Sequence, residues 1–524
     1  MRMHPAIAFF LVSSSVLASV SVHAVAQPVA SANPHTLRAE RAFDEARKLG
    51  PPALRAFLVG MPKGADLHVH LSGAVYAESW IRAAGEDGLC IDTVALRFVK
   101  PSAGGSCAAG GVAVQRMLIT MQQPASQELE DKLIDAFSMR SFVPSSSWSG
   151  HDQFFATFSR FSGTSKHHAG EWIDEVASRA AAQNEQYLEL MDTPDFAHAA
   201  ALARKTGWDA DLPALRQRLI DGGLFDEVEP ARAAMQTALD RRDQIEHCHS
   251  SQPAPACAVT VRFLYQILRD NPPAQVFAQT LLGFETIARV PGFVGINFVQ
   301  PEDAFYSMRD YTRQMEMLDY LHRLYPQVHI SLHAGELAEG LVPPDGLRFH
   351  IRQAVEIGHA ERIGHGVDVM DEDNAQALLK EMAARHVMVE INLTSNAVIL
   401  GVQGKDHPLP EYRRAEVPIA LSTDDEGVSR IDLTHEYERA VQEFGLSYSD
   451  LKSMARTSLE HAFLPGTSLW PHPDRFTAPV EVCAHQALGA EMPTKACVNY
   501  LKASPRAAEQ WELERRFRVF EAQW

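Results

Sequence analysis

The chain has 524 residues, of which 46% are hydrophobic and 22% charged, and its formal net charge is −18. The length allows one large domain with extensions or several ordinary ones, and the composition is that of a globular protein. The acidic balance excludes a broad surface for nucleic acid or anionic membrane, because phosphates would be repelled.

Residues 1–26 have the pattern of a secretory signal peptide. Arg2 supplies the charge, an apolar stretch follows, and the small residues Ala24–Ala26 precede Gln27. The alternative is a membrane anchor, but the apolar stretch is short and no charged flank follows it. We therefore expect an exported protein, periplasmic or secreted, with no membrane attachment after cleavage.

The rest of the chain alternates short apolar runs with helical patterns. An N-terminal helical segment is expected over 27–60, and the apolar runs are 65–70, 186–191, 259–264, 293–299, 328–333, 362–365, 387–393 and 418–422. Such alternation predicts an α/β fold, a (β/α)8 TIM barrel over 61–465. The extra length at 92–150 and 193–257 is interpreted as loop insertions. Residues 466–524 form a C-terminal extension that ends in a helix.

The six cysteines fall into three local couples. In an exported protein this arrangement favours disulfide bonds, although other pairings remain open. The nearest-neighbour couples are Cys90 with Cys107, Cys248 with Cys257, and Cys483 with Cys497. No CxxC spacing occurs, which argues against a thiolate metal site.

Imidazoles and carboxylates recur where the predicted strands end. Alternate residues of a strand project to one face, and in this barrel the C-terminal strand ends form the functional rim. We therefore expect one cluster of side chains from four different strands. Its members are His68, His70, His333, Glu336, His365, Asp424 and Asp425.

The residue types in this cluster indicate a metal-assisted hydrolase. Three neutral imidazoles and one carboxylate suit a single Zn²⁺ with a position left for water, and such an ion lowers the pKa of its water. The predicted ligands are His68, His70, His333 and Asp424. Glu336 is the candidate general acid. His365 is expected to orient the water, and Asp425 to bind substrate.

Several motifs in chain order resemble the adenosine deaminase family. They are "MPKGADLHVHLSGA", "SLHAGE", "RIGHGVD", "LTSN" and "LSTDDEGV". The "MPKG" lead-in, the signal peptide, the cysteines and "DAFSMRSF" are more similar to its secreted branch, the adenosine deaminase-related growth factors. The resemblance covers roughly residues 45–465 and implies the same barrel.

This resemblance implies a reaction and a substrate. The four ligands would hold one zinc ion, activated water would add to C6 of the purine, and Glu336 would protonate N1. His365 would assist the water, and Asp425 would share a hydrogen bond with N7. Adenosine or 2′-deoxyadenosine would become inosine or 2′-deoxyinosine plus ammonia. The implied partner is thus a small purine nucleoside and not a nucleic acid.

Two positions depart from the family pattern in substrate recognition. Ser72 stands where cytosolic members usually have an acidic residue that contacts the ribose 5′-hydroxyl, and Gln300 stands where a glycine N–H commonly meets purine N3. Ser395 either lines the pocket or caps the next helix.

Two alternatives to this function stay open. The Ser72 and Gln300 departures favour a deaminase of another 6-aminopurine derivative. A catalytically inactive secreted binding or signalling protein is a different class, against which the complete ligand set and Glu336 argue. Secreted relatives dimerise through an N-terminal helical segment, so a homodimer is a further expectation.

Overall fold

The computed structural model describes residues 34–524, so the predicted signal peptide lies outside the described residues. Within residues 34–524, eight parallel strands form one sheet in the order β1-β5-β6-β7-β8-β9-β10-β11. Their bounds are β1 Gly64–His70, β5 Glu185–Asp192, β6 Thr260–Leu268, β7 Phe293–Val299, β8 His329–Ala334, β9 Arg362–His365, β10 Met388–Ile391 and β11 Ile419–Leu421. Every predicted strand is present, and the (β/α)8 fold is confirmed.

The sheet closes between its first and last strands. Val69 forms a parallel bridge with Asp424 directly after β11. The backbone N–H of Asp424 donates to the carbonyl of His68 at 2.8 Å, and the N–H of His70 donates to the carbonyl of Asp424 at 3.2 Å. The hydrogen bonds that close the barrel therefore also place three of the predicted metal ligands side by side.

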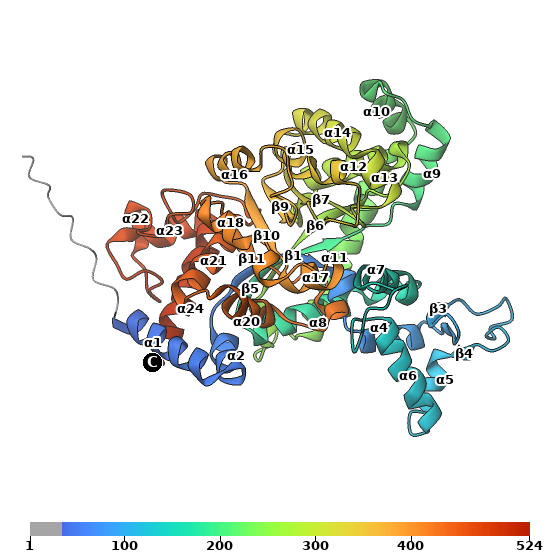
Figure 1. The fold of residues 1–524 in the computed structure, drawn as a ribbon, viewed down its shortest axis with the longest axis horizontal. Helices are drawn as coiled ribbons and strands as arrows, with labels where there is room; N and C mark the ends of the chain where they lie inside the picture. The colour runs from blue at the N-terminus through green and yellow to red at the C-terminus, as the bar shows by residue number, and fades with distance from the viewer. Residues whose placement is uncertain (1–33) are drawn as a thin grey trace, which may run out of the picture.

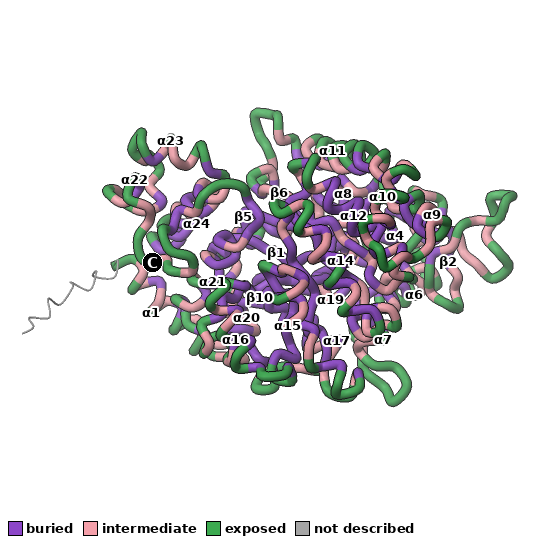
Figure 2. The backbone as a smooth tube through the Cα atoms, turned by 90° about the horizontal axis from the view of Figure 1, so that it is seen from above, coloured by how far each residue is buried: buried purple, intermediate pink, exposed green. Residues whose placement is uncertain are grey.

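Helices surround the strands, as Figure 1 shows. Every residue of β1, β7 and β10 is buried, and Figure 2 shows this buried centre beneath the more exposed helices. The outer helices include α8 Ala169–Ala182, α11 Val228–Ile245, α12 Pro273–Arg289, α14 Tyr311–Leu324, α15 His350–Glu356, α16 Ala375–Ala384, α18 Leu409–Arg414, α20 Leu433–Phe444 and α21 Tyr448–Glu460.

The segment 92–150 and its flanks build a separate layer at the rim. Its elements are α3 Leu71–Ala74, α4 Ala77–Glu86, β2 Cys90–Asp92, β3 Arg97–Val99, β4 Val112–Ala113, α5 Val114–Ile119, α6 Pro124–Ala136 and α7 Gly150–Phe161. The three short strands form an antiparallel sheet. In Figure 1, β3, β4, α5 and α6 project away from the barrel. The segment 193–257 begins with α9 Ala197–Thr206 and α10 Leu212–Asp221.

The two ends of the described chain pack together. The N-terminal segment contains α1 Pro34–Leu49 and α2 Pro51–Gly60, because Gly50 with a φ of 103° breaks the helix and Pro51 starts the next. The C-terminal segment contains α22 Glu481–Ala484, α23 Lys495–Ala503 and α24 Pro505–Glu521. The Phe57 and Phe520 ring centroids lie 5.1 Å apart, which joins α2 to α24.

The six cysteines, all within the described residues, form disulfides in the predicted nearest-neighbour scheme. The bonds join Cys90 to Cys107, Cys248 to Cys257, and Cys483 to Cys497. One bond therefore joins the 92–150 insertion to the start of β2, one lies within the 193–257 insertion, and one lies in the C-terminal extension. Among residues 34–524, the structure has no helix that is both long and apolar enough to span a membrane.

Candidate active site

The predicted metal ligands converge at the C-terminal rim of the barrel. His333 Nε2, at the end of β8, lies 3.1 Å from His68 Nε2 and 3.2 Å from His70 Nε2. The Oδ1 atom of Asp424 lies 3.2 Å from His70 Nε2 and 3.5 Å from His68 Nε2. All four side chains are buried. The structure thus brings these side chains together as the sequence predicts.

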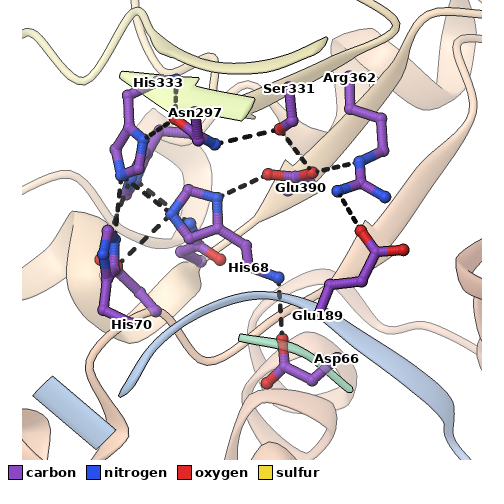
Figure 3. Close-up of polar contacts among 12 residues, drawn as sticks. Asp66, His68, His70, Glu189, Asn297, Ser331, His333, Arg362 and Glu390 are labelled. Atoms are coloured by element: carbon purple, nitrogen blue, oxygen red, sulfur yellow. Dashed lines mark hydrogen bonds and ion pairs between the residues drawn. The ribbon is translucent and has the colours of Figure 1, made fainter. Parts of the chain in front are cut away.

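The outer nitrogen of each of these histidines faces an oxygen acceptor on another strand, as Figure 3 shows for His68 and His333. The three Nδ1-to-oxygen distances are 2.6 Å for His68 with Glu390, 3.0 Å for His70 with Gln266, and 2.7 Å for His333 with Asn297. Because a carboxylate or amide oxygen only accepts, each Nδ1 carries the proton. In the neutral state that metal binding requires, each Nε2 presents a lone pair toward the other two. Without a metal, burial lowers the pKa of His68, but the hydrogen bonds with Asp424 and Glu390 outweigh it and raise this pKa to about 10.

Three lone pairs and a carboxylate oxygen that face one another repel unless a cation lies among them. Burial and the neighbouring His68 and His70 lower the pKa of His333 well below its ordinary value, which keeps this ring neutral. Neutral imidazoles backed by oxygen acceptors, together with one carboxylate, are donors that suit Zn²⁺. The residues present therefore fit a metal ion.

Replacing Gln266 tests whether the oxygen acceptors opposite the histidine Nδ1 atoms strengthen metal binding. We expect Gln266→Leu to weaken metal binding by about 10- to 100-fold, since the His70 ring is then free to change tautomer. Gln266→Glu keeps an oxygen opposite His70 Nδ1 and is the matched control, with affinity near that of the unmodified protein. Competition with a chromogenic chelator measures both affinities, and equal affinities for the two variants would contradict the prediction.

Glu336 lies in the turn that follows β8 and is held through its backbone. The N–H groups of Gly335 and Glu336 donate to the Glu302 carboxylate at 3.1 and 2.8 Å. Gly335 has a φ of 75°, and a Cβ there would lie 2.5 Å from Asp368 Oδ1. Burial and the nearby Asp424 carboxylate raise the pKa of Glu336 well above its ordinary value, which favours the protonated acid.

The Asp425 carboxylate occupies the space that a side chain at position 73 would need, so this position requires a glycine. An ideal Cβ on Gly73 would lie 1.5 Å from Asp425 Oδ1, so the glycine of "HLSGA" is needed for this carboxylate to reach the site. Burial and Asp424 raise the pKa of Asp425. Its Oδ1 atom is buried and has no hydrogen-bond partner within the described residues. Asp425 also lines the cavity, so its carboxylate lies where a ligand can approach it.

His365 lies beside the metal ligands, with its Nε2 3.6 Å from Glu336 Oε1 and 3.9 Å from Asp424 Oδ2. Burial lowers the pKa of His365 to about 3, so the ring is neutral. Ser395, in α17 Leu393–Ile399, donates its hydroxyl to Asp424 Oδ2 at 2.6 Å. It lies behind the carboxylate and is not among the residues that line the cavity, and its role in substrate binding stays a prediction.

A cavity of about 530 Å³ opens onto these groups, which is the size of a small-molecule site. The predicted site residues that line it are His70, Ser72, Gln300, His333, Glu336, Asp424 and Asp425. An aromatic wall completes it, formed by Trp80, Phe154, Phe155, Phe158, Phe161 and Trp172 from α4, α7 and α8. Sequence reasoning missed this wall, although the phenylalanine spacing in "FFATFSRF" is that of one helix face.

Gln300 keeps the backbone geometry that a glycine would adopt. Its φ is 85°, in the left-handed region that disfavours side chains. Its side-chain oxygen accepts a hydrogen bond from the N–H of Asp270 at 2.9 Å. The side chain is therefore tied to the backbone of the loop after β6, although it still lines the cavity.

A polar layer inside the barrel supports the ligands. Arg362 on β9 lies 2.7 Å from Glu189 on β5 and 2.7 Å from Glu390 on β10 (Figure 3). Because β5 and β9 are not neighbours in the sheet, the contact with Glu189 crosses the barrel interior. Glu390 thus joins the buried arginine to His68. A glutamate inside the apolar run "VMVEINL" was the sequence signal for this role.

The barrel and its rim define a protein of the (β/α)8 class with a site fitted for a metal. A family model described as adenosine deaminase matches residues 173–468, which is more than half of the chain. The chain belongs to the adenosine deaminase family.

Curated relatives match over shorter stretches. The adenosine deaminase of Clostridium perfringens strain 13 is 30% identical over 181 residues, which cover 34% of this chain and 51% of the relative. That of Shewanella loihica is 38% identical over 136 residues, or 26% of this chain and 38% of the relative. The match with the first of these relatives thus spans about half of that relative's length.

Solved structures share the fold at low sequence identity. Arabidopsis ADAL complexed with GMP has a TM-score of 0.50 and 20% identity, and the match covers 78% of this chain and 94% of that chain. An amidohydrolase from Burkholderia ambifaria with bound Zn has a TM-score of 0.51 and 19% identity, with 79% and 88% covered.

Proposed function

We propose that this protein is a zinc-dependent deaminase that converts adenosine or 2′-deoxyadenosine to inosine or 2′-deoxyinosine and ammonia. One Zn²⁺ per chain would be held by His68, His70, His333 and Asp424. The observation that carries the proposal is the convergence of three Nε2 lone pairs and a carboxylate beside the buried acid Glu336, at the floor of a cavity. Family membership supports the same reaction class.

Each residue of the chain has a distinct task in this reaction. The metal, when bound, lowers the pKa of water toward neutrality. Glu336 gives its proton to purine N1, which makes C6 electrophilic. Its carboxylate then takes a proton from the oxygen that has added at C6 and passes it to the departing amine, which leaves as ammonia. Asp425, which lines the cavity, shares a hydrogen bond with N7. The aromatic wall covers the base and limits access of bulk water.

The charge of the cavity favours a nucleoside over a nucleotide. Among the described residues that line it, Lys166 is the one Lys or Arg side chain, and its Nζ lies 3.0 Å from Asp192 Oδ1. A phosphate would therefore meet carboxylates without a free cation to bind it. We expect kcat/KM for AMP to be at least about 100-fold lower than for adenosine in the same ultraviolet assay. Equal values would contradict this preference.

Ser72 and Gln300 both line the cavity, and this favours a second candidate substrate class, other 6-aminopurine derivatives. An exported location is supported by the disulfides, and the signal peptide over 1–26 remains part of the proposal. The homodimer likewise remains a prediction, to be tested by the molecular mass in solution.

The experiment that tests the proposal is the ultraviolet spectrum of adenosine with purified protein, before and after metal chelation. We expect conversion to inosine that stops on chelation and returns with added Zn²⁺. No conversion with one bound zinc per chain would contradict adenosine as the substrate and leave other 6-aminopurines to be assayed. Neither conversion nor bound metal would contradict the hydrolase proposal itself.

A further inference from the structure

A chain of three hydrogen bonds runs from a backbone amide to the ring of His365. The N–H of Leu409, at the start of α18, donates to His407 Nδ1 at 3.1 Å. His407 Nε2 lies 3.0 Å from the side-chain oxygen of Asn396 on α17, and the Asn396 side-chain nitrogen lies 2.9 Å from His365 Nδ1. Leu409, His407, Asn396 and His365 are all buried.

The direction of each bond in this chain follows from its first donor. A backbone N–H only donates, so His407 Nδ1 accepts, and the neutral ring carries its proton on Nε2. That proton points to the Asn396 oxygen, which fixes the orientation of the amide, because the reversed amide would set an N–H against an N–H. The Asn396 nitrogen therefore donates to His365 Nδ1. A neutral His365 must then carry its proton on Nε2.

This result separates His365 from the three other histidines of the site. The Nδ1 atoms of His68, His70 and His333 face oxygen acceptors, whereas His365 Nδ1 faces amide donors, with Asn392 as a second one at 3.4 Å. Three rings thus present lone pairs and the fourth presents an N–H. The tautomer with the proton on Nδ1 can bind a metal through Nε2, whereas the tautomer with the proton on Nε2 can donate a hydrogen bond there.

The N–H of His365 has no partner within the described residues. The nearest carboxylate oxygens, on Glu336 and Asp424, are 3.6 and 3.9 Å away, beyond a good hydrogen bond. A donor held beside the reacting centre stabilises an oxygen on which negative charge develops. A ring in this tautomer cannot take a proton from water at Nε2.

We propose that Asn396 and His407 are positioning residues that hold His365 in the Nε2-protonated tautomer, so that its N–H donates to the reacting oxygen during deamination. The identity of that oxygen rests on the proposed function. The tautomer itself rests on the hydrogen bonds alone, so the two can be tested separately.

Asn396→Asp tests the relay with almost no change in shape. A carboxylate opposite His365 Nδ1 accepts, which draws the ring proton to Nδ1 and leaves a lone pair toward the substrate. We expect kcat to fall by about 10²- to 10⁴-fold, with KM and metal content close to those of the unmodified protein. An unchanged kcat would overturn the proposal.

His407 supplies a matched pair of variants in case Asn396→Asp folds poorly. His407→Leu removes the donor that orients the Asn396 amide, so we expect kcat to fall while the metal is retained. His407→Gln keeps an N–H at the Nε2 position, and we expect it to recover most of the loss. Equal activity of the two variants would overturn the relay, because a role in packing alone would not distinguish them by their donor.

The tautomer can be read without any assay of activity. In protein labelled with ¹⁵N-histidine, long-range proton–nitrogen spectra distinguish the two ring nitrogens, and the His365→Gln variant assigns the resonance. We expect the proton on Nε2 in the unmodified protein and on Nδ1 in Asn396→Asp. A proton on Nδ1 in the unmodified protein would overturn the proposal. If no purine nucleoside is deaminated, the proposed function fails, while this spectrum still decides the tautomer.

Discussion

Glu336→Gln is expected to lower kcat by about 10²- to 10⁴-fold while the metal stays bound. Glutamine has nearly the same shape as glutamate, so the turn held by Glu302 is kept. In the proposed reaction, the amide could not deliver a proton to N1, which is the step that would activate C6. Steady-state deamination of adenosine and metal content per chain measure the two parts of the expectation.

The matched control is Glu339→Gln, three residues farther along the same loop and exposed to solvent. It removes the same charge from the same region without touching the cavity, and we expect activity close to that of the unmodified protein. Full activity in Glu336→Gln would contradict its assignment as the acid. Loss of metal in that variant would instead show that the substitution disturbs the ligands.

Arg362→Met is expected to lower the free energy of unfolding by about 3–5 kcal/mol. The guanidinium lies between the Glu189 and Glu390 carboxylates, all of them fully buried, and also donates to the carbonyl of His461 at 3.0 Å. Removing it leaves two carboxylates in the barrel interior without a cation. Denaturant unfolding of the metal-free protein measures the change without a contribution from bound metal.

The control for this variant is Arg385→Met at the surface. Arg385 lies 3.0 Å from Glu381, and both side chains are more than a third exposed, so the pair is screened by water. We expect a change below about 1 kcal/mol. A similarly small change for Arg362→Met would mean that the buried carboxylates are neutralised by protonation rather than by the arginine.

The barrel, and the meeting of the candidate ligands at its rim, were predictable because their signals are local. Each strand is a short apolar run, and each candidate ligand stands near the end of one, so position along the chain already indicates position on the rim. The predicted boundaries differ where polar residues interrupt a run. Strand β6 continues through Gln266 to Leu268, and β10 ends at Ile391 because Asn392 begins the turn into α17.

The support around the ligands was not predictable, because it depends on contacts between distant segments. Glu189 and Arg362 meet only when the barrel closes, and nothing near either residue indicates the other. The hydrogen bond from Ser395 to Asp424 and the relay through His407 likewise join α17 to segments that follow it in the chain. The one available sequence signal was a polar residue within an apolar strand. Such a residue indicates that a buried polar partner exists, but not which residue that partner is.

The aromatic wall belongs to a different part of the chain from the groups that it faces across the cavity. The candidate ligands and Glu336 lie on the barrel strands or in the turns that follow them, whereas most of the wall comes from α7. This helix packs on the small sheet that the Cys90–Cys107 disulfide holds. Substitutions on one face of α7 would reshape the cavity without moving a metal ligand. The shape of the cavity can therefore be altered by substitutions in α7 alone, while the candidate ligand side chains and Glu336 keep their positions.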